Sequence, residues 1–241
     1  MAAEKRRKIA TPSSRSSKPR RWIRDVLLFG LLFVVWLYGF CTLCVIALRW
    51  SNPPTTAVQM ERCLDAIWKH RRYTKRFEFV PTRRISPDLQ HAVVAAEDTR
   101  FRQHHGFDWA EMQKVLEQDM QRQKIGRGGS TITQQLVKNL FLSTERSFVR
   151  KVAEFALVPM VEAILTKDRI LELYLNVIEW GPGIYGAQAA AEYYYHVPAS
   201  DVSREQAARL AAIIPAPLKR KPERMNEYSA VILERMEKMG W

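Results

Sequence analysis

The chain has 241 residues, of which 38 are Lys or Arg and 25 are Asp or Glu, so its formal net charge is +13. Apolar residues make up 47% of the sequence and aromatic residues 10%, which excludes wholesale disorder and collagen-like or low-complexity proteins. Three cysteines are too few for a disulfide-rich scaffold or a cysteine-rich zinc site.

The positive charge is concentrated at the N-terminus. Nine basic but only two acidic residues lie within residues 1–25, so the rest of the chain is only mildly basic. A tail of this composition could in principle bind nucleic acid. Because it directly precedes an apolar segment, we interpret it instead as a topology signal and a contact for anionic lipid, with no nucleic-acid partner. We therefore expect residues 1–25 to form a basic cytoplasmic tail.

Residues 26–48 contain no charged side chain and predict a transmembrane helix. A helix of this length, at about 1.5 Å per residue, spans a hydrocarbon core of roughly 30 Å. A buried helix of a soluble protein and a cleavable signal peptide are the alternatives. The first rarely runs this long without a polar face, and the second has a shorter apolar region that ends at a small-residue cleavage site. The excess of basic residues before the helix predicts that residues 49–241 are exported.

The exported segment, residues 49–241, predicts one mostly α-helical domain. Ser86-Pro87-Asp88 is typical of a helix start, because Pro is favoured in the first turn. Apolar residues then recur at helical spacing over residues 109–120. Strand signals are few, and residues 77–80 are the best candidate.

The second half of this domain continues the helical pattern. A helix begins near Phe148, and we expect it to kink or end early at Pro159. Ser203 and Gln206 form the pattern of a capping box for the next helix. Residues 232–239 predict a last amphipathic helix.

The apolar run 92–96 ends abruptly at Glu97 and Asp98. A carboxylate where a helix leaves the core is partly desolvated, which raises its pKa toward the range of a general base. A solvated acidic helix end is the alternative, and for an isolated Glu-Asp pair it is the more common one. His104 and His105 could ligate a metal, but adjacent histidines without a matching His or Cys elsewhere more often form structural hydrogen bonds.

Residues 128–139 begin with two glycines and continue with hydroxyl and amide side chains. If this segment is helical, Ser130, Gln134 and Lys138 share one face. Unpaired backbone N–H groups and the dipole at the helix start would favour an anion, and Lys138 adds a positive charge, which suits a phosphate or diphosphate. A glycine loop before an ordinary amphipathic helix is the alternative. The adjacent Gln134 and Gln135 favour a hydroxyl-rich ligand.

Glu154 falls on an otherwise apolar helical stripe that continues at Val158 and Val161. Burying this carboxylate without a partner would be costly, so the pattern implies an ion pair, a ligand or a metal. Arg150 and Lys151, one turn earlier, offer the ion pair. The aromatic and glycine residues of segment 179–186 are typical both of sugar stacking and of a tight turn, and the sequence leaves these two open.

Four segments match, in order, the signature motifs of bacterial peptidoglycan glycosyltransferases, which also form a domain of class A penicillin-binding proteins. The chain resembles the monofunctional members of that family, because no transpeptidase domain follows. The matching residues are Glu97-Asp98-x-x-Phe101-x-x-His104-x-Gly106, Gly129-Ser130-Thr131-x-Thr133-Gln134-Gln135-Leu136-x-Lys138-Asn139, Arg150-Lys151-x-x-Glu154, and Lys167-x-x-Ile170-Leu171-Glu172-x-Tyr174-Leu175-Asn176.

The resemblance implies a mainly α, lysozyme-like fold with two lobes around a cleft. It also implies an enzyme that polymerises lipid-linked disaccharide-pentapeptide (lipid II) into β-1,4 glycan strands and releases undecaprenyl diphosphate by inverting displacement. In that mechanism Glu97 is the general base, and Glu154 lies across the cleft, where it binds the donor or a divalent cation such as Mg²⁺. The metal ligands are not assigned and no organic cofactor is expected. The donor sugar and diphosphate are expected to bind Ser130, Gln134, Gln135, Lys138 and Arg146.

The same resemblance implies a location and partners. We expect a single-pass protein of the bacterial inner membrane whose catalytic domain is periplasmic. Its partners would be lipid II, the growing glycan chain and other proteins of cell-wall synthesis or division. A membrane-anchored lytic transglycosylase or lysozyme-like hydrolase and a non-catalytic scaffold are the alternatives. Hydrolysis needs no diphosphate site, so Lys138 and Arg146 favour the transferase.

Overall fold

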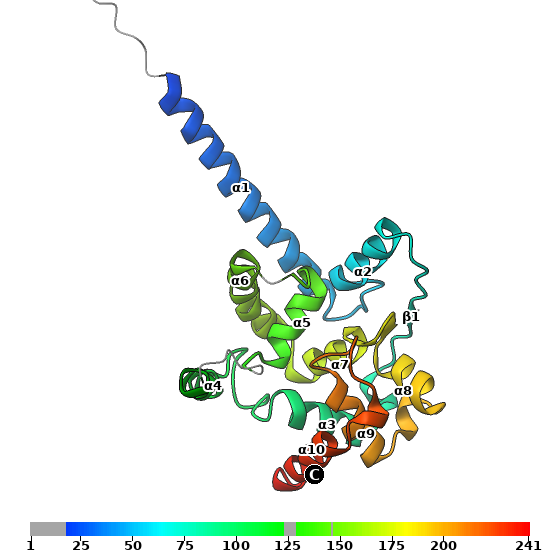
Figure 1. Cartoon of the computed structure of the whole chain (residues 1–241). Helices are drawn as coiled ribbons and strands as arrows, with labels where there is room; N and C mark the ends of the chain where they lie inside the picture. Colours follow the sequence, from blue (N-terminus) through cyan, green and yellow to red (C-terminus); the bar gives the residue numbers. More distant parts are fainter. Residues whose placement is uncertain (1–17, 123–128, 146) are drawn as a thin grey trace, which may run out of the picture. The chain divides into compact units, whose positions relative to one another are not determined.

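A computed structural model describes residues 18–122, 129–145 and 147–241. Within these ranges it contains ten α-helices, three short 3₁₀ helices and a single small sheet, so the prediction of a mainly α protein is confirmed (Figure 1). The chain divides into two compact units between Phe40 and Cys41.

The first unit consists of most of helix α1 (Lys18–Ala47). Its segment Arg21–Ala47 has a mean hydropathy of 2.4 and is long and apolar enough to cross a bilayer. This helix fits the predicted single-pass anchor. Its last two turns belong to the second unit, in which Cys41 and Val45 are buried.

The second unit contains all the other elements. Helix α2, which the sequence analysis did not predict, comes first, and a 3₁₀ turn precedes or follows several of the later helices. In chain order the elements are α2 (Ala57–Trp68), β1 (Arg76–Phe77), η1 (Thr82–Arg84), α3 (Pro87–Glu97), α4 (Trp109–Arg122), α5 (Ile132–Phe141), α6 (Phe148–Ile164), α7 (Lys167–Val177), β2 (Glu179–Gly181), β3 (Ile184–Tyr185), α8 (Ala187–Tyr195), η2 (Ala199–Asp201), α9 (Arg204–Ile213), η3 (Pro222–Arg224) and α10 (Asn226–Lys238).

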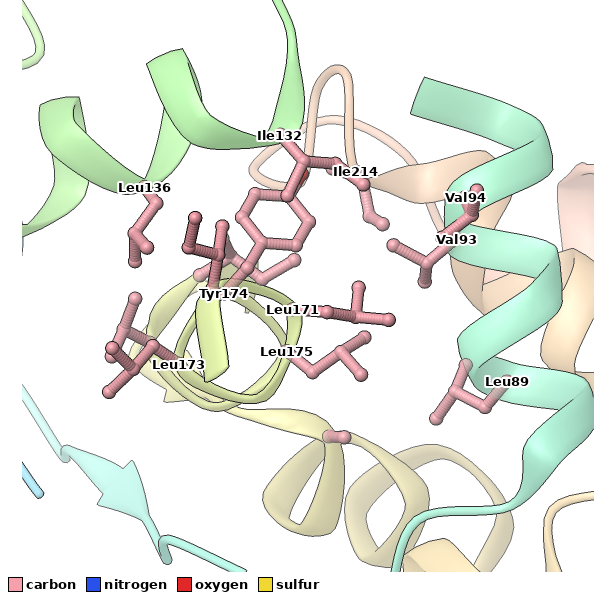
Figure 2. Close-up of a cluster of buried hydrophobic side chains, with 14 of the residues drawn as sticks. Leu89, Val93, Val94, Ile132, Leu136, Leu171, Leu173, Tyr174, Leu175 and Ile214 are labelled. Carbon is pink, nitrogen blue, oxygen red and sulfur yellow. The ribbon is translucent and has the colours of Figure 1, made fainter. Parts of the chain in front are cut away.

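The helices of this unit pack in two groups. Helices α3, α9 and α10 contact one another, whereas α5 contacts α2, α6 and α7. Figure 2 shows how α7 joins the groups: Leu171 and Leu175 point toward Leu89 of α3, and Tyr174 points toward Ile132 of α5. Two groups of helices agree with the predicted two lobes, and the likeness to lysozyme stays a prediction.

The predicted early end at Pro159 was wrong, because α6 runs to Ile164 with the proline inside it, and the alternative of a kink stays a prediction. Proline removes one backbone donor and crowds the preceding turn. Pro159 lies on the exposed side of α6, whereas Val158 and Met160 on either side of it are buried. The packed face of the helix therefore continues past the proline.

The predicted capping box at Ser203 and Gln206 is confirmed at the start of α9. The glycine and aromatic segment 179–186 forms a hairpin, in which β3 pairs antiparallel with β2 and parallel with β1. Trp180 and Tyr185 are fully buried in it. Of the two interpretations left open by the sequence, the structure favours the tight turn.

Candidate active site

Glu97 is the last residue of α3, and its side chain is half-buried where this helix leaves the core. Its Oε2 atom accepts a hydrogen bond from Nε2 of Gln135 at 2.6 Å. Burial raises the pKa of Glu97, and the hydrogen bond from Gln135 and the charges of Lys138 and Arg220 oppose that rise. The raised pKa predicted from the sequence is thus confirmed in direction.

The amide of Gln135 is held in one orientation by Tyr174. The Tyr174 hydroxyl donates to Oε1 of Gln135 at 3.0 Å. Burial raises the pKa of Tyr174 well above its ordinary value, so the phenol keeps its proton and remains a donor. Because the amide oxygen of Gln135 faces Tyr174, its NH₂ group must face Glu97. A fully buried tyrosine therefore sets which hydrogen bond reaches the carboxylate.

Asp98 joins three segments of the chain beside Glu97. Its carboxylate lies 2.9 and 3.1 Å from Nε2 of His104, and it accepts a bond from the backbone N–H of Ile132 at 3.0 Å. The end of α3, the loop that contains His104 and the start of α5 are thus tied together. Since α5 also carries Gln135, this contact fixes the distance between Gln135 and Glu97.

The structure gives His104 a structural partner. The ligand-type atoms of Asp98, His104 and Asp108 lie within 4.8 Å of one another. Asp98 and His104 are already hydrogen-bonded, and Asp108 accepts from Nε of Arg100 at 2.8 Å. This donor set is occupied by the protein's own groups, and His105 is exposed beside it.

The start of α5 corrects one expectation from the sequence. Thr131 and Gln134 form a capping box that uses the N–H groups of both residues, at 2.9 and 3.2 Å. The N–H of Ile132 is taken by Asp98. The prediction of unpaired backbone donors for a diphosphate was therefore wrong at these three positions, because a side chain of the protein already supplies the anion that the helix dipole favours.

The predicted common face of Ser130, Gln134 and Lys138 was wrong for Ser130. Because α5 begins at Ile132, Ser130 lies outside the helix, where it is exposed. Gln134 is buried, and its Nε2 atom has no hydrogen-bond partner among the described residues. Gln134 and Lys138, four residues apart in α5, share a helical face, and of these two Lys138 is the less buried.

Lys138 is a half-buried cation with no ion pair or side-chain hydrogen bond within the described parts of the chain. Burial lowers the pKa of Lys138, whereas the negative charges of Glu154 and Glu97 raise it. Both carboxylates are thus close enough to act on one ammonium group. Because Lys138 is not neutralised by a direct contact, it can bind an anionic ligand.

Glu154 is 3% exposed and forms the ion pairs that the sequence offered as one interpretation. It accepts from Nη1 of Arg150 at 2.7 Å and from Nζ of Lys151 at 2.5 Å. One carboxylate against these two cations, with Lys138 nearby, leaves an excess of positive charge. Arg146, the other predicted diphosphate ligand, lies outside the described residues.

A polar cavity of about 230 Å³ lies beside Glu97. Its walls come from the end of α3, from α4, from the loop before α5 and from α10. Glu97 therefore forms part of the wall of a space that a ligand can enter. The lining residues include Glu97, Asp98, Thr99, Asp108, Glu111, Ser130, Tyr228 and Arg235.

Sequence reasoning missed Tyr174 and Arg220 as neighbours of the site. Tyr174 stands on the apolar face of α7, where its spacing is that of a core residue. Arg220 follows α9 in a proline-rich segment. Such a segment has no helical periodicity from which the direction of the Arg220 side chain could be predicted. It donates to the carbonyl of Ala212 at 2.7 Å, and its charge lowers the pKa of Glu97.

The sequence of this chain is similar to those of known proteins. Residues 63–237 match the family model described as Transglycosylase. The chain is 45% identical over 197 residues to the biosynthetic peptidoglycan transglycosylase of Laribacter hongkongensis, which covers 82% of this chain and 85% of that protein. It is 42% identical over 225 residues to the protein of the same name from Dechloromonas aromatica, covering 90% and 95%.

The raised pKa of Glu97 predicts a pH-dependent gain in stability for Glu97→Gln. Between the ordinary range of a glutamate, about pH 4, and the raised value, the folded state binds more protons than the unfolded state, so stability falls as pH rises. Glutamine has no proton to lose. The thermal midpoint of the variant, measured in detergent, should exceed that of the wild type at neutral pH and approach it in acid.

The control is Glu237→Gln, which changes an exposed residue of α10. Its midpoint should follow that of the wild type across the pH range. A gain for Glu97→Gln that is constant with pH, or largest in acid, would contradict the assignment.

Proposed function

The chain belongs to the transglycosylase family, and from this premise we propose that it polymerises lipid II into β-1,4 glycan strands and releases undecaprenyl diphosphate. It is a peptidoglycan glycosyltransferase, an enzyme of cell-wall biosynthesis. One observation supports the proposed chemistry above the others: Glu97, a carboxylate of raised pKa, lines a polar cavity, and the unneutralised ammonium group of Lys138 is close enough to act on its charge.

In the proposed step, the 4-hydroxyl oxygen of the acceptor sugar attacks the anomeric carbon of the donor. The bond between that carbon and the diphosphate oxygen breaks, and its electron pair leaves with the diphosphate. Glu97 takes the hydroxyl proton. A carboxylate whose pKa is raised by burial is a stronger base than an exposed one, yet it is still ionised when the pH exceeds that pKa. Inversion at the anomeric carbon follows from this direct displacement.

The leaving diphosphate develops negative charge, and the cations beside Glu154 can stabilise it. We assign this task to Lys138, Arg150 and Lys151, with Arg146 as a further ligand. Preorganised charges are most effective at a site that excludes water, because they need no rearrangement as the reaction proceeds. Glu154 holds Arg150 and Lys151 in place through its two ion pairs.

The amide and hydroxyl residues predicted to bind the donor divide into three roles. Ser130 is exposed beside the cavity and is available to a sugar hydroxyl. Gln135 is assigned to Glu97, whose carboxylate it orients through a 2.6 Å hydrogen bond. Gln134 supports the start of α5, and because its amide nitrogen is buried we assign it no contact with the donor.

The residues around Glu154 do not fit a divalent cation. Both of its carboxylate oxygens accept from cations, and a further positive ion there would be repelled by Arg150 and Lys151. We therefore assign no step of the reaction to a metal such as Mg²⁺. The protein's own cationic side chains neutralise the charge of the leaving diphosphate.

We propose that α1 anchors the enzyme in the bacterial inner membrane, with its N-terminus in the cytoplasm and the second unit in the periplasm. The basic tail before the helix supports this orientation. A substrate that is itself dissolved in the bilayer stays close to an enzyme confined to the same surface. Other proteins of cell-wall synthesis or division are proposed partners.

Replacing Glu97 by Gln should lower turnover by on the order of 10² to 10⁴ while the protein stays folded, because the acceptor hydroxyl loses its base. The assay follows purified full-length protein converting labelled lipid II into glycan strands. Glu237→Gln is the matched control and should keep normal turnover. Normal activity of the Glu97 variant would remove that residue from the role.

The same assay separates synthesis from lysis. The wild-type enzyme should build long strands from lipid II. Cleavage of finished peptidoglycan without polymer formation would indicate the lytic alternative instead.

Replacing Lys138 by Ala should lower kcat/KM for lipid II by about 10²-fold, the size expected when one charge-stabilising group is lost from an active site. Lys114→Ala is the matched control, because Lys114 is exposed on α4 and its nearest acidic partner is 3.9 Å away. Unchanged kinetics of the Lys138 variant would show that the diphosphate binds elsewhere.

A further inference from the structure

Helix α2 is fixed to the second unit mainly by polar contacts. Arg62 donates to Oε2 of Glu179 at 3.1 and 3.2 Å, and Glu61 accepts from the hydroxyl and N–H of Thr144 at 2.5 and 2.7 Å. Glu179 is buried, and α2 packs on α5. These contacts hold the helix in one rotation about its axis, so the side that it presents outward is determined.

That outward side is apolar. Successive members are three or four residues apart, a spacing that places them on one helical face. Leu64 and Ile67 are each 65% exposed and Trp68 is 85% exposed. A surface helix ordinarily buries its apolar side, whereas α2 buries only Val58 and Ala66 of its apolar residues fully and exposes the larger ones. This apolar face of α2 consists of Met60, Cys63, Leu64, Ile67 and Trp68.

Basic residues follow the apolar face. Lys69, His70, Arg71 and Arg72 are all exposed at the end of α2. Asp65 pairs with Lys69 and Arg71 and offsets part of this charge. The remainder is positive and complements anionic lipid headgroups. An apolar stripe with Trp at its edge and Lys or Arg beyond it is the pattern of a helix that lies in a membrane interface.

The chain limits how far the start of α2 can lie from the end of α1. Arg169 of α7 donates to the carbonyls of Leu48 and Ser51 at 2.8 and 2.6 Å and to Oδ1 of Asn52 at 2.9 Å. The segment that leaves α1 is thereby held on the second unit. Between Asn52 and Ala57, the first residue of α2, the chain can extend at most about 18 Å. Within that reach, the nearest apolar phase is the membrane that α1 can cross.

We propose that the apolar face of α2 lies on the surface of the bilayer that α1 spans, with its side chains at the boundary between headgroups and acyl chains. The basic residues that follow contact the headgroups. This contact is a second attachment of the second unit to the membrane, and it restricts how that unit can turn on the anchor. The contact is independent of the assigned chemistry, since no residue of this face lines the cavity beside Glu97.

Cys63 allows the proposal to be tested on the full chain. In a Cys41→Ala, Cys44→Ala background, a nitroxide on Cys63 is the single label, and the protein is placed in nanodiscs of zwitterionic and anionic phospholipid. Power-saturation EPR then compares its accessibility to oxygen, which concentrates in lipid, with that to a water-soluble nickel chelate. We expect oxygen accessibility to exceed nickel accessibility.

A label on Glu237→Cys, with Cys63→Ala, is the control and should show the opposite ratio, since Glu237 is exposed on α10. Leu64→Asn with Ile67→Asn should reduce the oxygen excess at Cys63, and Val231→Asn, a change of an exposed apolar residue on α10, should leave it unchanged. Nickel accessibility at Cys63 equal to that of the control label would overturn the proposal. Protection of Cys63 from both reagents would also overturn it and would indicate a protein partner or a second copy.

Discussion

The candidate active site depends on one side-chain amide, which lies between a hydroxyl that donates a hydrogen bond to it and a carboxylate that accepts one from it. Gln135 accepts from the Tyr174 hydroxyl and donates to the Glu97 carboxylate. The first contact involves a fully buried tyrosine and the second involves a residue that lines a cavity, so the core determines which group meets the carboxylate of Glu97. Without this constraint the amide could turn and present its oxygen to a carboxylate, which would repel it. The donated hydrogen bond also limits how far burial can raise the pKa of Glu97.

Helix α5 links Gln135 to the other charged residues of the site. Asp98 caps its first turn and thereby ties it to the residue that follows Glu97. Two turns along the same helix, Lys138 responds to the charges of both Glu97 and Glu154. A single helix thus connects Glu97, the proposed base, to the cations that we assign to the departing diphosphate. On α6, Glu154 forms ion pairs with Arg150 and Lys151 and holds both in place. One negative charge does not neutralise these two positive charges.

The sequence predicted the features that depend on local pattern. Helical spacing, the capping box at Ser203 and the abrupt end of an apolar run at Glu97 are all visible in a few consecutive residues, and the structure agrees with them. The features that it could not predict depend on partners far along the chain. Asp98 lies 34 residues before the N–H that it caps, and this contact occupies a helix start that appeared free.

The role of Tyr174 also depends on a contact with a residue far along the chain. Its spacing on α7 is that of a core residue, and it is one; only the distant Gln135 gives its hydroxyl a second role. Helix α2 was not predicted, and the outward direction of its apolar residues depends on contacts with Thr144 and Glu179, far along the chain. In both cases the local pattern was correct and the missing information was tertiary.

The most direct measurement of the central claim is the dependence of kcat/KM on pH in the Gln135→Leu variant. In the wild type, activity should rise with pH as Glu97 ionises. Removing the donated hydrogen bond should raise the pKa of Glu97 further, so the acid limb of the profile should move to higher pH. Tyr174→Phe should move it in the same direction by less. An acid limb that stays in place, or moves to lower pH, in an active Gln135→Leu enzyme would contradict the account.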